Sequence, residues 1–234
     1  MTNGFLEQES KRANKKRRKL FLIVSVVFVC SMAIIIFGMK DSMDLSEYES
    51  RKVLVYLTII TVLMSVLLIV GLIGANRVAV KGKNLILPFN ENTKEAVGEI
   101  IDREILEGNI LVEGVFSYGC RVILTPSYLL MCDAIGKVTA IPRDKIYWIC
   151  AQVGSKGSSF TVRLVIFTEK KTFYVEGTDV EQVEHMADKI YQYIPNVFSD
   201  YDPFILSYQL DKLFDKNRDE FLKFYENEKN RYGE

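Results

Sequence analysis

Two long apolar stretches near the N-terminus, separated by a short polar segment, are the clearest pattern along the chain. Leu20–Met39 and Val53–Ala75 contain no charged residue. A helix rises about 1.5 Å per residue, so about 20 apolar residues span the ~30 Å hydrocarbon core of a bilayer. The pattern predicts a transmembrane hairpin over 20–76, with spans near 20–39 and 53–75. The first stretch is longer than the ~7–15-residue core of a signal peptide, and a second stretch follows, which favours an uncleaved anchor.

The pattern changes to helix and then to strands in the rest of the chain. Apolar residues recur at helical spacing over 93–107, where Asn92 or Thr93 offers an N-cap. From 110 to 177, short runs rich in Val, Ile, Tyr, Phe and Thr alternate with turn residues, which predicts strands. The expected strands lie near 110–117, 119–125, 128–133, 137–141, 145–153, 159–168 and 171–176.

Helices are expected again after the strands. A helix over 179–194 is predicted by a capping box of Thr178 and Glu181 and by Pro195 at its end. Because a helix with one apolar face must bury that face, we expect it to cover one end of the sheet. Its apolar stripe consists of Val183, Ala187, Ile190 and Ile194. Over about 206–230, aromatic residues at helical spacing among dense charges predict one or two further helices that pack on the domain.

Two segments resemble bacterial pleckstrin-homology-like (PH-like) domains. VILTPSYLL at 122–130, followed by IPRDKI at 141–146, is similar to the "LT…YL" hairpin and "IPxxxI" strand of that family. The resemblance covers about 115–195. It implies an α+β fold with an antiparallel β-sandwich or barrel capped by an amphipathic helix, and it implies a binding scaffold rather than a reaction. Many such bacterial proteins carry the domain beside a transmembrane hairpin.

These patterns together give an expected order of segments along the chain. It consists of a basic cytoplasmic tail (1–19), the hairpin (20–76), a connector with an amphipathic helix (77–109), the PH-like domain (110–196) and a helical tail (197–234).

Charge is unevenly distributed, although the formal net charge is zero. Residues 1–19 carry seven basic and two acidic groups, whereas 77–234 carry 20 basic and 24 acidic groups. The excess of Lys and Arg before the first stretch places both termini in the cytoplasm, with 40–52 outside the cell membrane. The mildly acidic remainder argues against nucleic acid as a partner. The cations nearest the bilayer are expected to contact anionic lipid: Lys15, Lys16, Arg17, Arg18 and Lys19.

The sequence contains few of the patterns that catalysis or metal binding requires. No spacing pairs His185, the single histidine, with a cysteine or serine, and the four cysteines lack a CxxC motif. Reduced thiols fit a cytoplasmic domain. We therefore expect no enzyme activity, no cofactor and no metal site. The loop 154–159 lacks the spacing of a phosphate-binding P-loop. It and a neighbouring hairpin nevertheless offer groups that could contact an anionic ligand: Lys156, Ser158, Lys170 and Lys171.

Two functional hypotheses follow from these expectations. In the first, the chain is a membrane-anchored PH-like module that binds an unknown protein partner or the membrane surface. In the alternative, it is an accessory or regulatory subunit of a membrane complex such as a transporter, acting through its spans. Gly71 and Gly74 would allow close helix packing, so a homo-oligomer formed through the spans fits either hypothesis.

Overall fold

The computed structural model describes residues 4–42, 48–75, 84–89, 92–156, 159–194, 198 and 203–232. The chain divides into two compact units, one formed by 10–79 and the other by 1–9 together with 80–234. The described part is of the expected α+β class. Its helices are α1 (Phe5–Ser42), α2 (Tyr48–Ala75), α3 (Lys94–Leu106), α4 (Val180–Tyr191), α5 (Pro203–Lys216) and α6 (Arg218–Tyr232), with short 3₁₀ turns at Ser117–Gly119 and Arg143–Lys145. Its strands are β1 (Leu85–Ile86), β2 (Val112–Val115), β3 (Arg121–Leu124), β4 (Tyr128–Cys132), β5 (Val138–Pro142), β6 (Ile146–Lys156), β7 (Ser159–Thr168) and β8 (Thr172–Glu176).

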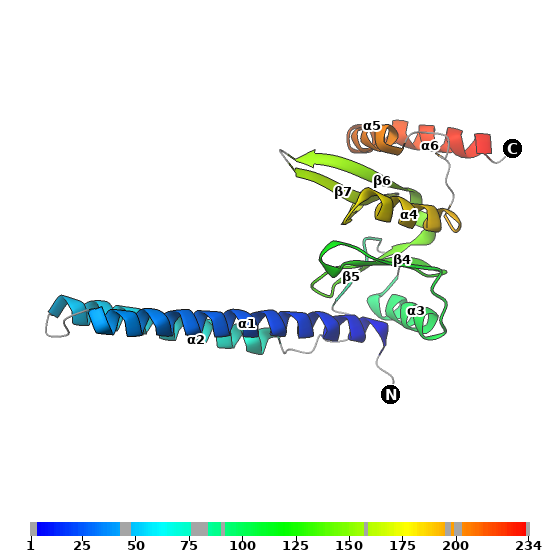
Figure 1. Ribbon diagram of the computed structural model, residues 1–234. Coiled ribbons are helices and arrows are strands. Elements are labelled where there is room, and N and C mark those ends of the chain that lie inside the picture. The colour runs from blue at the N-terminus through cyan, green and yellow to red at the C-terminus, as the bar shows by residue number, and fades with distance from the viewer. Residues whose placement is uncertain are drawn as a thin grey trace. The chain divides into compact units, whose positions relative to one another are not determined.

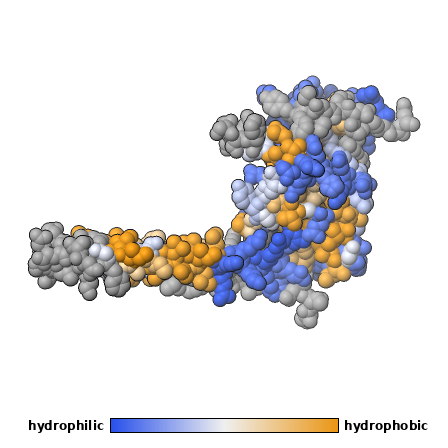
Figure 2. Space-filling model, viewed as in Figure 1, coloured by the Kyte–Doolittle hydropathy of each residue, from blue (hydrophilic) through white to orange (hydrophobic). Residues whose placement is uncertain are grey.

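The apolar stretches lie on α1 and α2. Since α1 begins at Phe5, the segment expected to be a tail is helical and runs without a break into the first apolar stretch. Over Phe5–Ile35, α1 is long and apolar enough to cross a membrane, and none of its most apolar window is buried by protein. Figure 2 shows the change along this helix from hydrophilic to hydrophobic side chains. In the described part of the chain, α1 alone passes this test; the apolar segment of α2, Val55–Leu68, is shorter.

The described residues of the second unit form two β-sheets. One has the strand order β1-β5-β4-β3-β2 and the other the order β6-β7-β8. All pairs are antiparallel except β1 with β5, in which Leu85 lies opposite Val138. The seven strands expected from the sequence are all present, with small shifts at their ends. The sequence did not predict β1, because a strand of two residues shows no periodicity.

The main core lies between the two sheets and is closed by α4 (Figure 1). Ile141 of the first sheet and Ile166 of the second are both fully buried in it. The expected apolar stripe of α4 is confirmed, since all four of its residues are buried there.

The expected capping box of α4 is wrong by one residue. Asp179 is the N-cap, and its carboxylate accepts from the Gln182 N–H at 2.7 Å. The Gln182 side chain in turn accepts from the Thr178 N–H at 3.1 Å. The short Asp side chain sits where its oxygen reaches the third helical N–H, so Glu181 plays no part in these capping bonds.

Helices also cover the outer faces of both sheets (Figure 1). α5 and α6 bury Phe214 and Phe221 against Trp148 and Phe167 of the three-stranded sheet, as the aromatic periodicity predicted. On the five-stranded sheet, α3 and the first turn of α1 form a third cluster that includes Ile101 and the N-terminal residues Phe5 and Leu6. Burial on both faces explains why the central strands are continuous apolar runs rather than alternating ones.

Candidate functional site

Two of the residues expected to contact an anionic ligand, Lys170 and Lys171, lie far from the end of β6, where the backbone of Lys156 lies. Ser158 and the side chain of Lys156 lie outside the described residues, but the backbone of Lys156 at the end of β6 lies opposite Ser159 at the start of β7. Lys170 and Lys171 follow the end of the same strand. The ten residues of β7 separate its two ends by about 30 Å at ~3.3 Å per residue. One phosphate or headgroup therefore cannot contact the end of β6 at Lys156 together with Lys170 or Lys171.

Lys170 and Lys171 make contacts within the domain. The Lys170 ammonium donates to the Pro88 carbonyl at 3.3 Å and lies 5.2 Å from the centre of the Phe89 ring. The Lys171 ammonium lies 4.6 Å from the centre of the Phe173 ring. Cation–π contacts of exposed side chains contribute about 0.5–1 kcal/mol each. These lysines thus help to hold the β7–β8 turn in place.

The cations expected to contact lipid lie on α1, where four of them are exposed: Lys15, Lys16, Arg18 and Lys19. The side chain of Arg17 is outside the described set. Lys15, Arg18 and Lys19 are spaced three and four residues apart, so they lie on one face of the helix. The structure therefore orders part of the basic cluster along a helical face instead of along a free tail.

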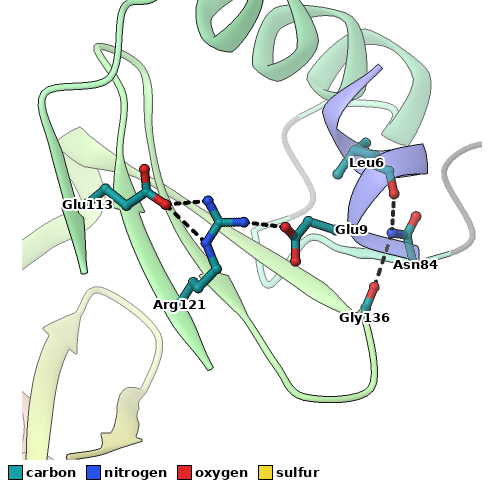
Figure 3. A network of polar contacts seen from close by, with 6 residues as sticks. All are labelled: Leu6, Glu9, Asn84, Glu113, Arg121 and Gly136. Carbon is teal, nitrogen blue, oxygen red and sulfur yellow. Dashed lines mark hydrogen bonds and ion pairs between the residues drawn. The ribbon is translucent and has the colours of Figure 1, made fainter. Parts of the chain in front are cut away.

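A second group of polar residues joins the first turn of α1 to the five-stranded sheet (Figure 3). The Arg121 guanidinium on β3 forms ion pairs with Glu9 of α1 and Glu113 of β2, and its Nε donates to Glu113 at 3.0 Å. Asn84 donates from one amide nitrogen to the Leu6 carbonyl at 2.9 Å and to the Gly136 carbonyl at 3.1 Å. This network holds the beginning of α1 on the domain.

Burial and charge act in opposite directions on Arg121. Desolvation disfavours the charged guanidinium, but the hydrogen bond to Glu113 and the charges of Glu9 and Glu113 outweigh it, so the pKa of Arg121 is raised. The sequence analysis did not single out Arg121. The only available signal was its place in an otherwise apolar strand, which gave no indication of its partner 112 residues away in the sequence.

A small hollow of about 290 Å³ lies beside β2, at an edge of the five-stranded sheet. Its lining residues are Leu111, Val112, Glu113, Lys189, Gln192 and Tyr193. One lysine and one glutamate give this lining no net preference for an anion. At the far end of β2, the Gln182 amide donates to the Val115 carbonyl at 2.7 Å. That carbonyl is therefore already bonded within the domain.

The described residues hold no group of three or more metal-ligating side chains, and His185 is exposed on α4. Among the described residues, Cys30, Cys120, Cys132 and Cys150 form no disulfide. The Tyr191 hydroxyl donates to the Ile149 carbonyl, and burial raises its pKa. Burial, followed by the charge of Asp211, raises the pKa of Tyr174 to about 12. Both phenols therefore stay protonated at neutral pH and act as structural hydrogen-bond donors.

Comparison with known proteins assigns no family, because no protein-family model, curated protein or solved structure matches this chain.

Proposed function

We propose that this chain is a two-span membrane protein that displays a PH-like domain in the cytoplasm. The domain acts as a non-catalytic module that binds a protein or the membrane surface. The observation that carries the proposal is the apolar surface of α1, because no residue of its most apolar window is buried by protein.

The cost of exposing that surface to water favours a lipid environment. Large apolar side chains are exposed along α1 from Leu20 to Ile35 and along α2 from Val53 to Val70. Each Å² of apolar surface left in water costs about 25 cal/mol, and soluble monomers rarely expose contiguous apolar patches above a few hundred Å². The second span rests mainly on the sequence, since Val53–Ala75 contains 23 residues without a charge.

The order of the strands supports a PH-like domain. The antiparallel strands β2–β5 form one sheet, β6–β8 form the other, and α4 follows directly and closes the core between them. This is the arrangement that the resemblance of 122–130 and 141–146 leads us to expect. The domain has two additions to the two antiparallel sheets and single capping helix that the resemblance implies. These additions are the short strand β1 and the helices that cover both outer faces.

The test of the membrane proposal is fractionation combined with protease protection. The full-length protein should stay with membranes after alkaline carbonate washing. A C-terminal epitope tag should resist protease added outside intact cells and should be cut once the membrane is permeabilised. Full-length protein in the supernatant, or loss of the tag from unbroken cells, would contradict the proposal.

Crosslinking in intact membranes tests the binding role. A photo-reactive residue at Tyr193, beside the β2 hollow, is compared with one at His185 on the exposed side of α4. A protein captured from one position and not the other supports a defined protein interface. Capture of lipid alone supports a membrane-surface role, and capture of neither contradicts the binding module.

A further inference from the structure

One face of α1 carries cations at one end and apolar side chains at the other. Lys15, Arg18 and Lys19 are followed on the same face by four exposed aliphatic residues, and all seven side chains line one open groove, which we call the α1 groove. The aliphatic residues are Leu22, Ile23, Val26 and Val27. The groove has a volume of about 620 Å³.

We propose that the α1 groove binds one anionic phospholipid, with its phosphate against the cations and the upper part of an acyl chain against the aliphatic residues. This inference rests on the membrane insertion proposed above. A guanidinium and two ammonium groups meet no carboxylate among the described lining residues, and these residues are therefore complementary to an anion. Arg18 can hold a phosphate through two parallel N–H groups.

The length of the groove fits a lipid better than a free phosphate. From Arg18 to Val27 the helix rises about 13 Å at 1.5 Å per residue, which is comparable with the first half of an acyl chain. A free phosphate would leave the aliphatic half of the groove uncovered. In the proposed orientation the charged heads lie at the level of the headgroups, and the aliphatic residues lie in the hydrocarbon.

The structure separates this site from general electrostatic attraction. Lys16 is exposed and carries the same charge, but it does not line the groove. If the cations attracted lipid only as a diffuse basic cluster, Lys16 and Lys19 would contribute equally to lipid binding. If the site is formed by one helical face, Lys19 should contribute more than Lys16. Lys16 therefore provides a matched control.

The experiment is native mass spectrometry of the full-length protein in detergent, titrated with dioleoyl phosphatidylglycerol, dioleoyl phosphatidylcholine or glycerol 3-phosphate. We expect one phosphatidylglycerol to be retained more strongly than phosphatidylcholine. Arg18→Gln and Lys19→Gln should each weaken its retention about fivefold, which corresponds to ~1 kcal/mol per cation. Lys16→Gln removes the same charge outside the groove and should weaken retention less than Lys19→Gln. Ile23→Ala with Val26→Ala should weaken retention of the lipid.

Equal losses in Lys16→Gln and Lys19→Gln would overturn the site in favour of diffuse attraction. Equal retention of the two lipids would also overturn it, as would binding of glycerol 3-phosphate as tight as that of the lipid. Sedimentation of each variant with membranes keeps the two proposals apart. If the wild-type chain is membrane-bound but does not discriminate between the lipids, only the lipid site fails. If it is not membrane-bound, the proposed function fails first.

Discussion

Replacing Arg121 with methionine tests whether the first turn of α1 is an integral part of the domain. The Arg121 side chain is 17% exposed and that of Glu9 is 8% exposed, so the Glu9 end of this ion pair is buried and the Arg121 end is partly buried. Removing one partner of a buried pair costs about 3–5 kcal/mol, because the remaining charge loses its counter-charge and does not regain its full hydration. With the residual exposure, we expect Arg121→Met to destabilise the domain by about 2–4 kcal/mol.

The two carboxylates should differ in their contributions. Glu113 is 39% exposed, and solvent screens its ion pair with Arg121. Glu113→Gln should therefore cost less than about 1 kcal/mol. Glu9→Gln should cost more, because Glu9 is buried. The double variant Glu9→Leu with Arg121→Met removes both charges and should be more stable than Arg121→Met alone.

The assay is thermal unfolding of the full-length protein in detergent, followed by the fluorescence of Trp148, the single tryptophan, which is 1% exposed. For a protein of this size, each kcal/mol shifts the midpoint by about 2–4 °C, so Arg121→Met should lower it by about 5–15 °C. Two results would refute the reasoning: a shift below about 2 °C for Arg121→Met, or equal shifts for Glu9→Gln and Glu113→Gln. Either result would mean that the Arg121–Glu9 pair contributes no more to stability than a surface ion pair.

Three further predictions concern the rest of the domain. Phe221→Ala removes a fully buried ring from α6 and should destabilise the domain by about 3–5 kcal/mol. Thermal unfolding followed by Trp148 emission should then show a lower midpoint. An unchanged midpoint would mean that α6 does not pack on the sheet. The pKa of Tyr174 is raised to about 12 in the folded chain, whereas it is about 10 in the unfolded chain. Protonated Tyr174 therefore stabilises the fold below about pH 10, and this stabilisation is lost as the pH rises from about 10 toward about 12. Tyr174→Phe should therefore lose less thermal stability than wild type between pH 9 and pH 11, and equal losses would contradict this. A fragment of residues 110–196 lacks α3, α5, α6 and the first turn of α1, so it should elute as aggregates in size-exclusion chromatography. A monomeric fragment that unfolds cooperatively would contradict the claim that the sheets need helices on both outer faces.

The strands and most helices could be predicted because each has a local pattern several residues long. β-branched and aromatic residues between turn signals predicted β2–β8, and the aromatic spacing of 206–230 predicted the packing of α5 and α6. Thr93 was one of two expected N-caps for α3, and its hydroxyl accepts from the Ala96 N–H at 3.3 Å. The cap of α4 was misplaced because neighbouring Thr178 and Asp179 are both good N-caps, and only the course of the backbone decides between them.

The candidate sites were less predictable because they depend on contacts that are distant in the sequence. Lys156 was expected to lie near Lys170 and Lys171 because a single strand, β7, separates them in the sequence. In an antiparallel meander, however, the two ends of one strand lie a full strand length apart. Phe5 and Leu6 are two apolar residues in a polar segment, too few to show a periodicity. Their burial becomes evident only when Asn84 and Arg121 are seen to bind the same helical turn.

The covering of the sheets explains why the compact unit is larger than the segment that resembles PH-like domains. A strand that is apolar on both faces needs a layer on each side, and the chain supplies the outer layers from its two ends. α5 and α6 come from the C-terminal part, while α3 and the first turn of α1 come from before the strands. Because α1 also carries the basic cluster and the first apolar stretch, the same helix contributes to the core of the domain and to the proposed anchor. Changes in its first turn should therefore affect the stability of the sheet, and an anchor of this kind cannot be exchanged for another helix without rebuilding that part of the core.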